Sequence, residues 1–223
     1  MQRYHNLDFL RAFAMLMGLV IHAPMLFWVP DFAKVFGIDN IAPAEEWVNV
    51  IGRFISSWRM PVFFLLSGFF AILVIERKGT SQFLRDRVIR VGLTCLVFSS
   101  LYDISDGSFD YTILHLWFLY ELMIFALFFS LLYRLKIIKD LLCIKMPPKI
   151  GFIVVLWLIS TVPLAYILNN SWHPSALKVP TTYFDLKIGN LFYHFSYFWV
   201  GVILYANQNI FIKIKKTKAI LVL

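Results

Sequence analysis

The fold is decided by the apolar run Trp47–Ile75, which has the sequence WVNVIGRFISSWRMPVFFLLSGFFAILVI. A helix of about 20 apolar residues is long enough to cross the hydrocarbon core of a bilayer, which is ~30 Å thick. In lipid the backbone N–H and C=O groups must pair with one another, so only helices and closed barrels can span it. This run is too long and too continuous for a barrel strand. We therefore expect a transmembrane helix that is tilted or begins outside the lipid.

Five further apolar runs accompany this one, at Leu7–Trp28, Val91–Tyr102, His115–Tyr133, Ile150–Leu168 and Asn190–Ala206. Hydrophobic residues make up 60% of the chain and charged residues 15%, with a mean hydropathy of +0.74. A soluble domain is about half apolar and a quarter charged. The sequence therefore predicts an all-α, polytopic transmembrane helix bundle of six spans in one domain, residues 1–223. Ala219–Leu223 is expected to start a seventh helix in a chain that is incomplete at its C-terminus.

The lysines and arginines behind the net charge of +8 gather in alternate loops between these runs. The loops after the second, fourth and sixth runs carry five, five and four of them, against one, none and two in the other loops. Positively charged loops stay in the cytoplasm. We therefore expect a cytoplasmic N-terminus in a multi-pass protein of the inner (plasma) membrane, and no nucleic-acid partner. The cysteines, Cys95 and Cys143, show no metal-ligand spacing, so no metal is expected.

The first run carries three polar side chains that are costly in a membrane, Asp8, Arg11 and His22. Arg11 and His22 differ by only about 20° around a helix, Asp8 lies about 60° from Arg11, and His22 lies about 16 Å further along the axis. One interpretation is a boundary ion pair between Asp8 and Arg11 with a buried packing histidine. The other is a cavity with an anion-binding mouth and a titratable base deeper inside.

Arg59 and Glu121 are the other charged residues that lie inside apolar runs. Arg59 precedes Pro61, so it either snorkels beside a kink or has a functional role. Glu121 is one to two turns into the fourth run and needs a partner, for which Arg59 is a candidate. His194 and Tyr197 in the sixth run are interpreted as structural.

Arginines recur at short spacing in the loop after the second run, as Arg85, Arg87 and Arg90. They fit an ordinary cytoplasmic charge cluster. If this loop is helical, Arg87 and Arg90 share a face and could bind phosphates with bidentate hydrogen bonds.

Together these stretches resemble acyltransferase family 3, the integral-membrane enzymes that O-acylate extracytoplasmic carbohydrates. The resemblance is carried by an arginine followed after ten residues by a histidine and by four further stretches, in the order Arg11 to His22, Arg59–Gly68, Arg87–Arg90, His115–Leu119 and Tyr197–Gly201. The fourth stretch is similar to the branch related to periplasmic-glucan succinyl transfer. Ser67-Gly68, taken alone, indicates close helix packing. The resemblance covers nearly the whole chain and implies further helices beyond it.

The resemblance implies a reaction that moves an acetyl or succinyl group from cytoplasmic acyl-coenzyme A (acyl-CoA) to a hydroxyl of an outward-facing glycan. His22 is expected to act as general base or transient acyl carrier, with Arg11 orienting the donor and Arg59 stabilising the oxyanion or a succinyl carboxylate. The residues expected at the donor are Arg87, Arg90 and Asp8, and those expected at the substrate are His115 and Glu121.

Two other classes of protein compete with this interpretation. A transporter or flippase for a glycan or lipid would also need buried charges, and inverted repeats would favour it, but none is visible in the sequence. A structural membrane protein has no need for the charges in the first, second and fourth runs.

Overall fold

The computed structural model describes residues 5–22, 46–107, 111, 113, 116–138 and 180–207. Within these ranges the chain is mostly helical and contains no strand, which confirms the all-α prediction. The helices are α1 (His5–His22), α4 (Glu46–Lys78), α5 (Thr80–Arg87), the π-helix η1 (Val88–Gly92), α6 (Leu93–Asp106), α7 (Trp117–Arg134) and α10 (Ile188–Ala206). Two segments, Trp58–Lys78 and Trp117–Arg134, are long and apolar enough to cross a membrane. The number of spans and the side of the N-terminus stay predictions, and the run 150–168 lies outside the described residues.

The basic segment expected as a loop after α4 is instead helical. Gly79 alone separates α4 from α5, with a positive φ of 83° that favours glycine, and its N–H donates to the Ile75 carbonyl over 2.8 Å. α5 shows no apolar periodicity because only one of its residues, Phe83, is buried in the core. α5, η1 and α6 then continue without a break, so the expected span Val91–Tyr102 is part of a longer helical rod.

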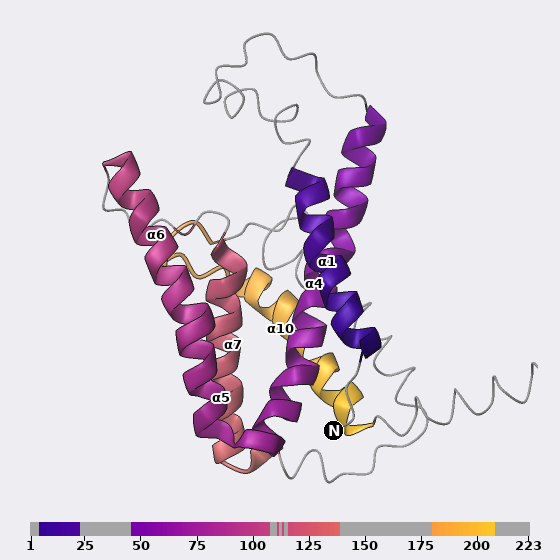
Figure 1. Cartoon of the computed structure of the whole chain (residues 1–223), viewed down its shortest axis with the longest axis vertical. Coiled ribbons are helices and arrows are strands. Elements are labelled where there is room, and N and C mark those ends of the chain that lie inside the picture. Colours follow the sequence, from indigo (N-terminus) through magenta and orange to yellow (C-terminus); the bar gives the residue numbers. More distant parts are fainter. Residues whose placement is uncertain are drawn as a thin grey trace, which may run out of the picture.

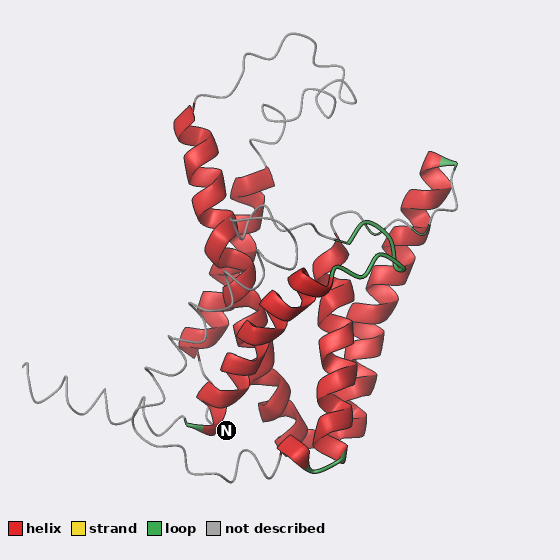
Figure 2. Ribbon diagram, turned by 180° about the vertical axis from the view of Figure 1, so that it is seen from behind, coloured by secondary structure: helices red, strands yellow, loops and turns green. Residues whose placement is uncertain are grey.

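The helices form two groups that α10 connects (Figures 1 and 2). α1 lies along α4, and the rod of α5, η1 and α6 lies beside α7. α10 crosses α4 and also contacts α7. These contacts bring helices that are far apart in the sequence to a common core.

The helix ends gather on two opposite sides, as expected for helices that alternate in direction (Figure 1). On one side, Tyr205 at the end of α10 donates to Glu76 at the end of α4 over 2.8 Å. Arg134 at the end of α7 donates to Ser81 at the start of α5 over 3.3 Å. We call this side the basic end; its described arginines and lysines are Arg11, Arg77, Lys78, Arg85, Arg87, Arg90, Arg134 and Lys136.

At the opposite end, the segment that leads into α10 is bound to α6 and α7. The Tyr183 hydroxyl lies 2.7 Å from Ser99 Oγ and donates to the Cys95 carbonyl over 3.2 Å, and the Tyr120 hydroxyl donates to the Tyr183 carbonyl over 2.7 Å. Burial raises the pKa of Tyr183 to about 12, so the hydroxyl stays protonated and keeps these bonds at ordinary pH. The segment therefore holds the start of α10 against α6 and α7.

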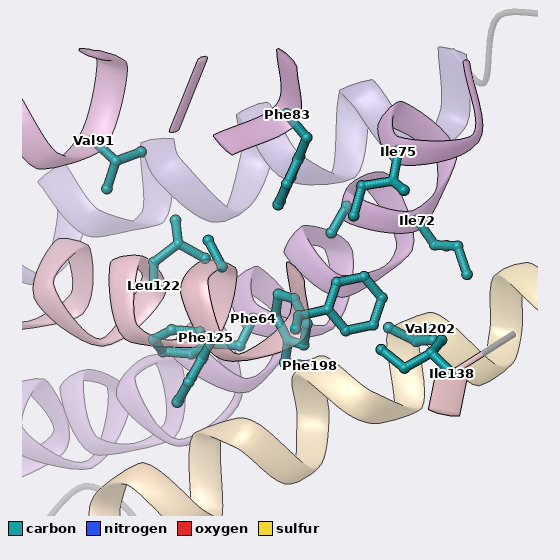
Figure 3. Packing of buried hydrophobic residues seen from close by; sticks show 13 residues of the cluster. Phe64, Ile72, Ile75, Phe83, Val91, Leu122, Phe125, Ile138, Phe198 and Val202 are labelled. Atoms are coloured by element: carbon teal, nitrogen blue, oxygen red, sulfur yellow. The ribbon is translucent and has the colours of Figure 1, made fainter. Parts of the chain in front are cut away.

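Aromatic and aliphatic side chains from four helices and η1 fill the core (Figure 3). Phe64 of α4, Phe83 of α5, Phe129 of α7 and Phe198 of α10 are each at most 1% exposed. Phe198 contacts Phe129 edge-on, with ring centroids 5.5 Å apart. This core fixes how α7 and α10 sit against α4.

Glycines bring α4 and α10 into backbone contact. A Cβ atom added at Gly68 would overlap the Phe198 carbonyl, and one added at Gly201 would overlap the Leu65 carbonyl. Both glycines are buried. This confirms that Ser67-Gly68 marks close helix packing, in the manner of small residues in membrane bundles.

Apolar side chains also cover the outside of the bundle. On α6 the exposed residues include Leu93, Leu96, Phe98, Leu101 and Ile104, each more than half exposed. A soluble protein rarely exposes such a large apolar surface. The outside of α6 is typical of a helix that contacts lipid or other membrane helices.

Candidate active site

The polar face of α1 packs against α4 through its small residues. Ala14 and Gly18 are buried, and the guanidinium of Arg59 from α4 lies directly on Gly18, where a Cβ atom would overlap Nη1. Arg59 Nε is fully enclosed and has no hydrogen-bond partner in the described chain. A buried donor without a partner is costly, so this nitrogen suits an acceptor that arrives with a ligand.

The position of Arg59 along α1 follows from the helix register. Gly18 lies seven residues, about 10 Å, beyond Arg11, and His22 ends α1 one turn later. Arg59 therefore lies beside α1 between the levels of Arg11 and His22. The side chain of His22 lies outside the described residues, so its direction stays a prediction.

Arg11 is the arginine of α1 that lies at the basic end. Its guanidinium lies over the ring of Phe70 in α4, 5.5 Å from the centroid. Arg87 lies in the same way over Phe83, at 5.3 Å. Burial lowers the pKa of Arg87, and the nearby positive charges of Arg11 and Arg90 lower it further, whereas Asp86 raises it. Three arginines thus share a local field that a bound anion would relieve.

The two arginines of the Arg87–Arg90 stretch flank an irregular turn. Arg87 is the last residue of α5 and is half-buried, whereas Arg90 lies within η1 and is exposed. Single π-helical turns often occur at functional sites. Asp8, also expected at the donor, is half-buried near the start of α1.

Glu121 lies in a buried polar cluster between α7 and α10. Its carboxylate is 0% exposed and accepts a hydrogen bond from Asn190 Nδ2 over 2.6 Å. Its other oxygen lies 2.7 Å from His194 Nδ1. The imidazole stacks on Phe64, with centroids 4.6 Å apart, and on Trp117 at 5.3 Å.

The expected pairing of Glu121 with Arg59 is therefore wrong. Arg59 points from α4 toward α1, whereas Glu121 faces α10, where His194 and Asn190 bind both of its oxygens. The partners differ because the crossing of α10 with α4 and α7 brings the two α10 residues to the carboxylate.

The family model described as an acyltransferase domain matches residues 4–223. The chain belongs to acyltransferase family 3. It is 33% identical over 95 residues to glucans biosynthesis protein C of Escherichia coli K12, and 32% identical over 95 residues to the protein of that name from Escherichia coli O1:K1. Each match covers 43% of this chain and 23% of the relative, so the chain matches about a quarter of their length. No solved structure matches the chain.

The structure brings together part of the arginine set that acyltransferase family 3 suggested. Arg11, Arg87 and Arg90 lie close enough to share a field, whereas Arg59 lies on α1 at Gly18, about two turns further along. Glu121 lies in a separate cluster on the far side of Phe64. The side chain of His115, like that of His22, lies outside the described residues.

Two residues of α10 were not expected from the sequence as partners of Glu121. Asn190 and His194 are four positions apart on α10, so they share one helix face. That spacing, together with a buried glutamate that needs a hydrogen-bond partner, could have predicted the contact from the sequence. In the described part of the chain, no group of three or more His, Cys, Asp or Glu side chains could hold a metal ion.

Proposed function

We propose that this member of acyltransferase family 3 moves an acyl group from cytoplasmic acyl-CoA to a hydroxyl of an extracytoplasmic carbohydrate. The name of the relatives refers to glucan biosynthesis, so the proposed acceptor is a glucan. The proposed acyl group is succinyl or acetyl. The bilayer surrounds the helices, and the two substrates approach from opposite sides.

The basic end supports binding of the donor. The phosphates of acyl-CoA carry the negative charge that the shared field of Arg11, Arg87 and Arg90 favours. Guanidinium groups bind phosphate with bidentate, charge-assisted hydrogen bonds. The phosphates would stay at the basic end while the acyl thioester extends along α1 into the bundle, with Asp8 near the mouth.

Arg59 supports the chemistry of transfer. Its enclosed, unpaired Nε is a preorganised donor, and such donors stabilise the oxyanion that forms on an acyl carbonyl. For a succinyl donor the same guanidinium could instead pair with the free carboxylate. His22, one turn beyond Gly18, would take the proton of the acceptor hydroxyl or carry the acyl group transiently. His115, just before α7, would contact the acceptor.

One observation carries the proposal: the Arg59 guanidinium lies on Gly18 of α1, between the levels of Arg11 and His22, with Nε unpaired. An arginine that only snorkelled to the membrane surface would point along its own helix toward water. Arg59 instead points across to the helix that carries the proposed base.

Binding of radiolabelled succinyl-CoA to the full-length protein in detergent tests the donor site. Arg87→Ala is expected to weaken binding about 10- to 100-fold, because charge-assisted hydrogen bonds are worth about 1.5–3 kcal/mol. Arg85→Ala is the matched control, since it removes the same charge from an exposed position of the same helix. Equal affinity in both variants and the wild type would contradict the donor site.

Mass spectrometry of the cell's periplasmic and surface glucans tests the transfer itself. His22→Ala is expected to abolish acyl esters on the glucan while membrane insertion remains normal. Undiminished ester content would exclude His22 from the reaction. Loss of the glucan from the periplasm, rather than of its esters, would favour a transporter.

A further inference from the structure

Two exposed aromatic side chains meet at the end of the bundle opposite the basic end. Phe184 is 82% exposed and Tyr111 is 58% exposed. Their rings contact edge-on, with centroids 5.9 Å apart and planes at 85° to each other. Tyr111 precedes α7 and Phe184 precedes α10, so the pair joins two loops that are far apart in the sequence. Exposed apolar groups that gather at one place often mark a binding site.

The backbone of Tyr111 is fixed on both sides in an unusual conformation. Its φ is 56°, a positive value that is rare for a residue with a bulky side chain. Its N–H donates to Asp103 Oδ2 over 3.1 Å, and its carbonyl accepts from the Tyr183 N–H over 3.3 Å. Such a conformation persists only where surrounding contacts impose it, and it is often found at ligand sites. These contacts anchor the backbone while the ring stays exposed.

The loop of Phe184 is joined to the loop that carries a proposed acceptor contact. The Ile113 N–H donates to the Thr181 carbonyl over 2.9 Å, and Ile113 is fully buried. His115, for which contact with the acceptor is proposed, follows Ile113 by two residues, and Phe184 follows Thr181 by three. The exposed ring pair therefore belongs to the same pair of loops as the proposed acceptor contact.

Charged groups beside Phe184 indicate that its ring faces water rather than lipid. Asp185 Oδ1 lies 2.5 Å from Lys187 Nζ, and Asp185 Oδ2 accepts from Thr181 Oγ1 over 3.2 Å. The hydrogen bond from Lys187 and those from Thr181 lower the pKa of Asp185, so the carboxylate stays charged at ordinary pH. A charge in the hydrocarbon core is costly, and the residues that anchor proteins at the membrane surface are mainly Trp and Tyr. A phenylalanine next to a partly exposed ion pair is better suited to a ligand that arrives from water.

The ring pair suits a carbohydrate. One face of a pyranose ring presents C–H groups with a slight positive charge, which pack on the negative face of an aromatic ring. The hydroxyls at the rim of a sugar donate to oxygen acceptors, such as the carboxylate of Asp185 next to Phe184. Tyr111 adds a phenolic hydroxyl that can donate or accept. The surface therefore combines apolar faces with polar groups at their edge, as a sugar does.

We propose that Tyr111 and Phe184 form a stacking platform for a sugar residue of the acceptor glucan, away from the hydroxyl that reacts. The identity of the ligand rests on the proposed function. Contacts remote from the reacting atoms stabilise the bound glucan and the transition state equally. Such contacts lower the KM for the glucan and leave kcat unchanged.

Binding of unesterified periplasmic glucan to the full-length protein in lipid nanodiscs tests the platform. Phe184→Leu keeps an apolar side chain but removes the flat ring, so it is expected to weaken binding about 5- to 10-fold. The KM for the glucan in acyl transfer should rise by the same factor, while kcat changes less than about twofold. Phe184→Trp keeps an aromatic face and is expected to bind the glucan within about twofold of the wild type.

Leu186→Ala is the matched control, because it removes an exposed aliphatic side chain from the same segment, and it should leave the affinity for the glucan unchanged. Equal affinity in Phe184→Leu and the wild type would overturn the platform. An equal loss in Leu186→Ala would also overturn it and would assign this surface to contact with the bilayer. A wild type that does not bind the glucan overturns the platform as well. A wild type that binds the glucan through Phe184 but transfers no acyl group supports the platform and contradicts the proposed function instead.

Discussion

At the scale of single residues, the position of Arg59 in the candidate site depends on residue 18 having no side chain. Gly18 has no Cβ, and the guanidinium of Arg59 occupies that space. The clash that a methyl group would cause involves the far end of a flexible side chain, so Arg59 can move away at little cost to the fold. The position of Arg59 is therefore sensitive to residue 18, whereas the packing of α1 is not.

Gly18→Ala is expected to reduce acyl transfer about 10- to 100-fold, because a shift of about 1 Å in a catalytic group costs that much. The melting temperature in detergent should stay the same or rise slightly, since alanine favours a helix more than glycine does. Turnover and thermal unfolding are measured on the same preparation. Full activity in the variant would mean that the position of Arg59 on Gly18 has no catalytic role.

At the scale of helices, α4 contacts α1 on one side and α10 on the opposite side, and both contacts are made by the stretch Arg59–Gly68. Arg59 faces α1, and Gly68 faces α10 nine residues later. A Cβ atom added at Gly68 would overlap the backbone of Phe198, which cannot move without moving α10. A Cβ atom added at Gly18 would overlap only the flexible side chain of Arg59. The crossing also holds His194 against Phe64, so the two regions share this scaffold.

Gly68→Ala is expected to destabilise the protein by about 2–3 kcal/mol, as overpacking in a tight core does. α10 must move away from α4, which would loosen the ring contact between Phe64 and His194. Thermal unfolding in detergent measures the effect, with Gly92→Ala as control because an added Cβ there meets only Met123 at van der Waals distance. An unchanged melting temperature would contradict the close crossing.

At the scale of the whole molecule, the two sides of the bundle have different chemistry. Arg11 and the basic residues of α5 and η1 lie on one side, and the Tyr183 segment with Asp103 lies on the other. This is the charge asymmetry that orients membrane proteins. Donor and acceptor would then meet from opposite faces.

Reporter fusions are expected to show this orientation. Alkaline phosphatase fused after Gly107 should be active, because that turn follows α6 at the outer end. The same reporter fused after Lys78, next to the arginines of α5, should be inactive, and a cytoplasmic fluorescent reporter there should fluoresce. The reverse pattern would invert the proposed approach of the two substrates.

The sequence predicts those parts of the structure that depend on local composition. α4, α7 and α10 agree with long apolar runs to within three residues at each end, since burial in lipid imposes a strong, continuous signal. α5 was missed because it is short, charged and fixed by a single buried phenylalanine. The partner of Glu121 was missed because it is 73 positions away, and only the crossing angles of the helices decide which side chains meet.

The π-helical turn at Val88–Gly92 has a consequence for the rod that contains it. Such a turn holds one more residue than an α-helical turn, so it rotates everything after it by about 100°. The extra residue therefore sets the direction that side chains of α6 take relative to those of α5. Before the turn, Phe83 packs into the core, and after it, Ser99 contacts Tyr183. Deleting one residue there would turn the π-helical turn into an α-helical one and leave Ser99 facing the loop it binds, whereas deleting a second residue would turn Ser99 away, so chain length at this turn matters more than side-chain identity.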